Sequence, residues 1–180
     1  IGILVIHPLL PDAQVGRRSL VLGYGFLAGV LTLTLLMRGV DLMGLPLKAE
    51  MLLPPLALLA IALAMVQRTR PRSLGGLWVT DAYWALPTWQ KFLIAVLVAL
   101  VAVRIGGFWL EVSWRPLFPW DAYMHWATKA KVWSDAQALL PFVSYDDWLA
   151  AESLRVFTDN HPDYPITTPL LQTWMSLILG

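Results

Sequence analysis

Three long apolar runs constrain the fold of this chain more than any other feature. They cover residues 19–37, 51–66 and 91–112. An α-helix rises about 1.5 Å per residue, so runs of this length approach or reach the roughly 30 Å hydrocarbon thickness of a bilayer. Backbone polar groups in lipid must be satisfied within the segment, which favours helices. We therefore expect three membrane-spanning helices.

The composition points the same way. Hydrophobic residues make up 58% of the chain and charged residues 14%, against about a quarter charged in an average soluble domain. The net charge of +1 offers no basic stripe for nucleic acid. The absence of cysteine excludes disulfides and thiolate metal sites. The predicted fold class is an all-α, polytopic membrane protein.

The sequence QRTRPR follows the second run and indicates the topology. It carries three arginines and no acid, so the positive-inside tendency places the loop 67–91 in the cytoplasm. The polar stretch 113–165 then lies outside, and the apolar residues 166–180 begin a fourth span. Residues 1–112 form the first spans. Because the chain starts at Ile1 and stops within an apolar run, we expect an N-terminal fragment of a longer protein, in a bacterial inner membrane.

Two features inside the predicted spans suggest specific contacts. Gly25 and Gly29 form a small-xxx-small pattern that allows close helix packing, although glycines are also common in spans. Arg104 lies in the outer half of the third span, where an isolated charge is costly. It either extends to the outer headgroups, where Glu111 is a candidate partner, or lines a cavity for a lipid phosphate.

The extracytoplasmic loop is expected to form helices that lie on the membrane surface. Residues 120–138 predict one helix, with Trp126 and Trp133 on the face turned to the membrane. Residues 146–157 predict a second helix, which Ser144 caps in an S-x-x-D pattern with Asp147.

Candidate functional residues cluster in this loop. Asp121 opens the first helix, where it is either a catalytic carboxylate or a partner of the helix dipole. His125 is either a site residue or a surface histidine. The remaining candidates are Lys129, Lys131, His161, Asp163 and Tyr164.

His161 either binds phosphate or fixes its turn by hydrogen bonding, and Tyr164 is either a site residue or an interfacial anchor. A divalent cation near Asp121, His125, His161 and Asp163 is conceivable, although no ligand spacing demands one.

The motifs PWDA at residues 119–122, KAK at 129–131 and HPDYP at 161–165 together resemble the GT-C glycosyltransferases. These polytopic membrane enzymes use sugars linked to polyprenyl phosphate, and they include protein O-mannosyltransferases and aminoarabinose transferases of lipid A. The resemblance covers the C-terminal third of the chain. It implies transfer to a glycan, lipid or protein acceptor in the cell envelope, with Asp121 at the place of the family's catalytic acid.

The chain departs from the family pattern in two respects. The acidic loop follows the third span rather than the first, and Asp121 has no adjacent second acid. Chemically, an inverting transfer needs a base for the acceptor hydroxyl, a role that suits Asp121. It also needs cations for the departing phosphate, which Arg104, Lys129, Lys131 and His161 can supply.

Two other functions fit the same sequence. In a transporter subunit, Arg104 and Glu111 would line a solute path. In a non-catalytic assembly protein, the tryptophan-rich loop would only dock at the membrane interface.

Overall fold

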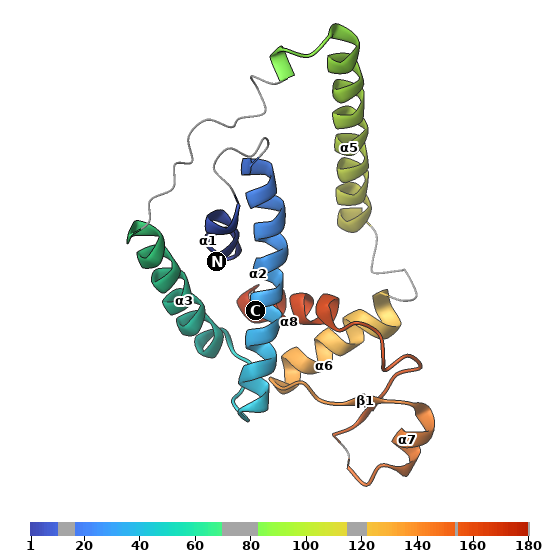
Figure 1. The fold of residues 1–180 in the computed structure, drawn as a ribbon. Coiled ribbons are helices and arrows are strands. Elements are labelled where there is room, and N and C mark those ends of the chain that lie inside the picture. Colours follow the sequence, from blue (N-terminus) through green and yellow to red (C-terminus); the bar gives the residue numbers. More distant parts are fainter. Residues whose placement is uncertain (11–16, 70–82, 115–121, 154, 180) are drawn as a thin grey trace.

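The computed structural model describes residues 1–10, 17–69, 83–114, 122–153 and 155–179. Within these ranges the chain is mostly helical (Figure 1). The longest helices are α2 (Arg17–Leu42), α3 (Ala49–Thr69) and α5 (Thr88–Trp114). All three are long and apolar enough to cross a membrane. The helices predicted at the three apolar runs are therefore confirmed, and each continues a few residues further at both ends.

A glycine ends α2 and turns the chain back toward α3. Gly44 has a φ of +70°, a conformation that costs glycine little. Its N–H donates to the carbonyl of Asp41 at 2.8 Å, and the N–H of Leu45 donates to the carbonyl of Val40 at 3.1 Å. This pair of bonds is a Schellman motif, which satisfies the last carbonyls of the helix.

The N-terminal helix α1 (Gly2–Ile6), followed by the 3₁₀ turn η1 (His7–Leu9), packs against α2. A methyl group on Gly2 would lie 1.8 Å from the carbonyl oxygen of Gly25 and 2.4 Å from the nitrogen of Gly29. The two backbones therefore touch at the glycines. This confirms the packing role predicted for Gly25 and Gly29 and identifies α1 as their partner.

The polar segment after α5 is more broken than predicted. In place of one helix over residues 120–138, a π-helical turn η2 (Ala122–Ala127) leads into α6 (Thr128–Ala136). The hydroxyl of Thr128 donates to the carbonyl of Tyr123, five residues earlier, at 2.7 Å. Gln137 then adopts a φ of 52° and ends α6.

The second predicted helix is shorter than expected. Helix α7 (Tyr145–Ala150) stops before the strand β2 (Phe157–Thr158), which pairs in parallel with β1 (Phe142–Val143). The predicted cap is confirmed, because the hydroxyl of Ser144 accepts the N–H of Asp147 at 3.2 Å and donates to its carboxylate at 2.6 Å.

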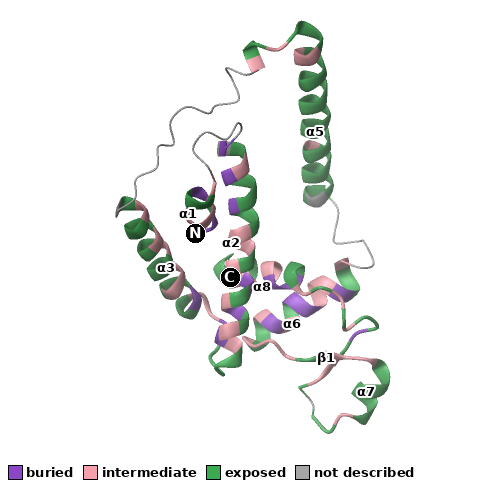
Figure 2. Cartoon of the chain, in the orientation of Figure 1, coloured by how far each residue is buried: buried purple, intermediate pink, exposed green. Residues whose placement is uncertain are grey.

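The hydrophobic core joins the polar segment to the turn between α2 and α3. Helix α8 (Thr167–Leu179) also contributes to it. Its buried members are Met37, Val40, Leu47, Leu52, Trp133 and Leu170 (Figure 2). Trp133 therefore packs inside the protein, and the indole N–H donates to the carbonyl of Leu140 at 2.9 Å. The prediction that this tryptophan faces the membrane is wrong, because α2, α3 and α8 provide its apolar surroundings.

The two remaining helices differ in their surroundings. Helix α8 crosses α2 rather than running along it (Figure 1), and α8 packs on α6 and α2. Helix α5 is exposed along nearly its whole length (Figure 2), and no residue of its apolar stretch is buried by the described parts of the chain.

Candidate functional site

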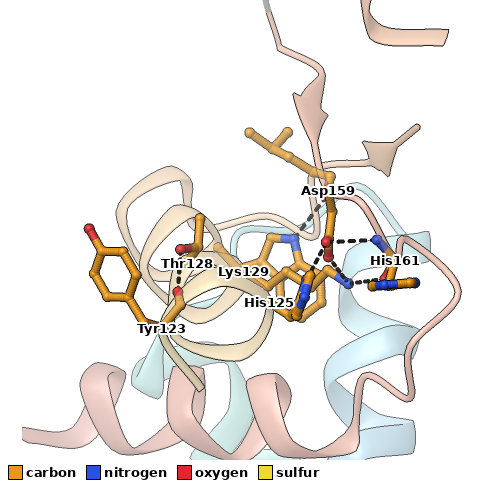
Figure 3. A network of polar contacts seen from close by, with 8 residues as sticks. Tyr123, His125, Thr128, Lys129, Asp159 and His161 are labelled. Atoms are coloured by element: carbon orange, nitrogen blue, oxygen red, sulfur yellow. Dashed lines mark hydrogen bonds and ion pairs between the residues drawn. The ribbon is translucent and has the colours of Figure 1, made fainter. Parts of the chain in front are cut away.

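The carboxylate of Asp159 is the centre of a buried polar network (Figure 3). Asp159 directly follows β2, and its N–H donates to the carbonyl of Val143 at 2.9 Å, which continues the strand pairing. Its side chain is thereby directed at η2 and α6. Oδ1 accepts hydrogen bonds from Nδ1 of His125 and from the N–H of His161, the latter at 3.0 Å. Oδ2 lies 2.6 Å from Nζ of Lys129.

The three charged or titratable members of the network are shielded from solvent. Asp159 is 6% exposed, His125 3% and Lys129 1%. Burial alone would raise the pKa of Asp159. Hydrogen bonds from Lys129, the His161 N–H and His125, together with the positive charge of Lys129, outweigh burial and lower this pKa below its ordinary value.

Asp159 is therefore ionised at neutral pH. An ionised carboxylate only accepts hydrogen bonds, so Nδ1 of His125 carries the proton that faces it.

One carboxylate reaches both His125 and Lys129 because the two residues are four positions apart. His125 lies in η2 and Lys129 in the first turn of α6, so both side chains face the same acceptor (Figure 3). A further bond from Nζ of Lys129 to the carbonyl of His161, at 3.3 Å, ties the same lysine to the HPDYP sequence. The network thus fixes the loop 159–164 against η2 and α6.

Three rings of the network form an aromatic cluster. The rings of His161 and Tyr164 are stacked, with centroids 4.7 Å apart and planes 8° apart. The ring of His125 meets both edge-on, at 5.3 Å from His161 and 5.1 Å from Tyr164. His161 is exposed and Tyr164 is partly exposed. The side chains of these two residues are therefore accessible to a ligand, whereas His125 lies behind them.

A pocket of about 430 Å³ adjoins the network on the side of Lys129. We call it the Arg38 pocket. It is lined by Arg38, Asp41, Leu42, Lys129, Trp133, Leu139, Leu140, Pro141, Phe142, Pro162 and Ile166. Its volume is within the range of small-molecule sites, about 300–1,000 Å³.

Four of the predicted site residues meet in this region, namely His125, Lys129, His161 and Tyr164. Asp121, the predicted catalytic carboxylate, lies outside the described residues.

The other predicted site residues lie apart from the network. Lys131 is exposed and pairs with Asp135 at 2.6 Å on the surface of α6. Asp163 is exposed. Arg104 and Glu111 are both exposed on α5, and neither lines the Arg38 pocket.

Sequence reasoning missed Asp159, Arg38 and Asp41. For Asp159 there was a signal, since an acid two residues before the histidine of an HP turn can accept that histidine's backbone N–H. Arg38 and Asp41 have no comparable signal, because they lie just after the first apolar run, where charged residues are common.

The network offers little room for a metal ion. No group of three or more histidine, cysteine or acidic side chains in the described ranges is arranged to hold one. The ammonium of Lys129 already lies against Oδ2 of Asp159, where a cation would bind.

Comparisons of this chain with protein-family models, with curated proteins and with solved structures gave no match. Its chemistry must therefore be argued from the residues themselves.

Proposed function

We propose that the protein is a membrane-embedded glycosyltransferase that moves a sugar from a polyprenyl-phosphate carrier to an acceptor on the extracytoplasmic side. The observation that carries the proposal is the contact between the two halves of the predicted motif. His125 and Lys129 come from one end of the polar segment and His161 from the other, and the buried carboxylate of Asp159 joins them. Such a network provides a rigid support for a site at the end of the apolar helices.

The arrangement of the long helices supports the proposed topology. Along the sequence, two long helices, α3 and α5, lie between the α2–α3 turn and the polar segment. If each of them crosses the membrane once, the chain returns to the side on which the α2–α3 turn lies. The two regions are in contact: the N–H of Leu47 donates to the carbonyl of Gln137 at 2.7 Å, and the N–H of Leu139 donates to Asp41 at 2.8 Å. An odd number of crossings between them would place the two regions on opposite sides of the membrane.

In the proposed reaction, a hydroxyl oxygen of the acceptor attacks the anomeric carbon of the sugar. The bond between this carbon and the phosphate oxygen breaks, and the lipid phosphate leaves with the electron pair. The carboxylate of Asp121 takes the hydroxyl proton. Asp121 directly precedes η2, and Asp159 holds η2 through His125. The network therefore fixes the turn next to the proposed base.

The remaining residues have different proposed roles. Lys129 is a positioning residue, because its charge is compensated by Asp159. His161 contacts the donor, since its ring is accessible and stacked on Tyr164. A protonated imidazole there would offset negative charge on the departing phosphate.

The experiment is a transfer assay with the purified protein in detergent and a panel of radiolabelled polyprenyl-phosphate sugars. We expect release of the lipid phosphate with at least one donor. Asp121→Asn should reduce this release by at least about a hundredfold, the scale on which general-base catalysis contributes.

Asp135→Asn is the matched control, since Asp135 is an exposed acid of the same segment that pairs only with Lys131 among the described residues. It should retain activity, and both variants should elute as folded, monodisperse protein. Full activity of Asp121→Asn would refute the role of Asp121.

A further inference from the structure

The Arg38 pocket contains three charged side chains, and only one of them lacks a close partner. Lys129 is paired with Asp159 at 2.6 Å. Asp41 accepts the N–H of Leu139 at 2.8 Å, which holds the chain after α6 against α2. Arg38 is exposed and makes no ion pair with any described residue. Its guanidinium is thus the group in the lining that is free to bind an anion.

The position of the pocket indicates what kind of anion it would receive. Arg38 lies one turn before the end of the candidate span Ser19–Leu42, at the level where an apolar helix meets the headgroups. Leu42 is 87% exposed beside it, and Phe142 and Ile166 continue the apolar lining. A ligand with a charged head and a hydrocarbon chain matches this combination. Arginine binds phosphate with two parallel hydrogen bonds, which gives it an advantage over lysine there.

We propose that the Arg38 pocket binds the phosphate of the polyprenyl carrier and that Arg38 is the residue that contacts this phosphate. The choice of carrier rests on the proposed function. The isoprenoid chain leaves the pocket past Leu42 and Ile166, and Pro162 in the HPDYP sequence forms part of the same lining. The phosphate is thereby held next to the loop whose conformation Asp159 fixes.

Asp41 provides a sharp test because it lies in the same lining as Arg38. Its negative charge opposes an anion in the pocket. Asp41→Asn removes that charge and retains an oxygen for the N–H of Leu139. If the ligand group is a phosphate at Arg38, this variant binds more tightly. If the pocket instead recognises hydroxyl or amino groups through Asp41, the variant binds less tightly.

The experiment is native mass spectrometry of the full chain in detergent, titrated with polyprenyl monophosphate and, separately, with phosphatidylglycerol. We expect Arg38→Gln to weaken the binding of polyprenyl monophosphate at least fivefold and Asp41→Asn to strengthen it at least twofold. Arg155→Gln is the matched control, because Arg155 is an exposed arginine of the polar segment between α7 and β2 and lies outside the pocket. It should leave the affinity unchanged.

Three results would overturn the proposal: unchanged binding in Arg38→Gln, equal weakening in Arg155→Gln, or weaker binding in Asp41→Asn. Equal, Arg38-dependent binding of phosphatidylglycerol would assign the pocket to bulk anionic lipid and reject the carrier. The titration uses neither sugar nor acceptor. A protein that binds polyprenyl phosphate but transfers no sugar would therefore contradict the proposed function and leave this binding site standing.

Discussion

A carboxylate that is only 6% exposed and still ionised depends on its partners, and Asp159 has three of them. Each partner belongs to a different piece of chain: His125 to η2, Lys129 to α6 and the His161 N–H to the HPDYP loop. Removing the charge at this position therefore releases three elements at once. Breaking a buried ion pair by changing one member typically costs about 3–5 kcal/mol, because the other charge is left uncompensated.

We predict that Asp159→Asn lowers the free energy of unfolding by about 3 kcal/mol at pH 7. Lys129→Met should cost a similar amount, whereas the double variant should cost clearly less than the sum, because no buried charge then remains unpaired. Thermal unfolding in detergent, followed by circular dichroism, measures all three. Additive losses would show that Asp159 and Lys129 are not coupled.

The acid dependence of Asp159→Asn gives a separate prediction. The pKa of Asp159 is lower in the folded protein than its ordinary value of 3.8. The ionised carboxylate therefore adds stability above that value, and this contribution is lost as the pH falls through the folded pKa. The difference in melting temperature between wild type and Asp159→Asn should be constant from about pH 7 to 5 and shrink below about pH 4. A difference that stays constant down to pH 3 would contradict this assignment.

At the residue scale, the sequence identified several residues of the candidate site, but not the contacts that each of them makes. His125, Lys129, His161 and Tyr164 were identified as candidates, and they meet. The burial of His125 could not be predicted, because it depends on Asp159, which lies 34 positions away in the chain. Local patterns carry no information about such a distant pairing.

At the scale of elements, the long helices were predictable and their partners were not. An apolar run of about twenty residues is by itself almost sufficient to predict a helix. The predicted end of the first span fell at Met37, whereas α2 continues to Leu42, because Arg38 and Asp41 are compatible with a helix until Gly44 stops it. The π-helical turn and the parallel pairing of β1 with β2 depend on tertiary contacts, so they had no clear sequence pattern.

The packing of α1 on α2 gives a prediction with an internal control. A methyl group on Gly25 would lie 2.9–3.0 Å from atoms of Ile3, including its backbone, so α1 must shift. A methyl group on Gly23 in the same helix would meet no atom within 4 Å. Gly25→Ala should destabilise the protein by about 1–3 kcal/mol, whereas Gly23→Ala should be neutral or add up to about 1 kcal/mol.

Hydrogen exchange of α1, with thermal unfolding alongside, separates these outcomes. Faster exchange in α1 is expected only for Gly25→Ala. Equal exchange rates in α1 and equal stabilities of the two variants would mean that α1 does not pack against this part of α2.

At the scale of the whole molecule, one topology unites the observations. The apolar surface of α5 is exposed in the described chain, which is costly in water and natural in lipid. The α2–α3 turn and the polar segment contact one another, as two crossings by α3 and α5 would allow. In the proposed orientation, the arginines that follow the second apolar run lie on the cytoplasmic side. A site for a lipid-linked sugar on the outer side follows only if this orientation is correct.

The most direct test of the orientation uses the absence of native cysteines. Single cysteines are introduced at two exposed alanines, Ala150→Cys in α7 and Ala85→Cys in the loop before α5. Intact cells are then treated with a membrane-impermeant maleimide. The account predicts that Ala150→Cys is labelled and that Ala85→Cys is labelled only after the cells are opened. Labelling of Ala85→Cys in intact cells, with protection of Ala150→Cys, would place the Asp159 network in the cytoplasm and contradict the account.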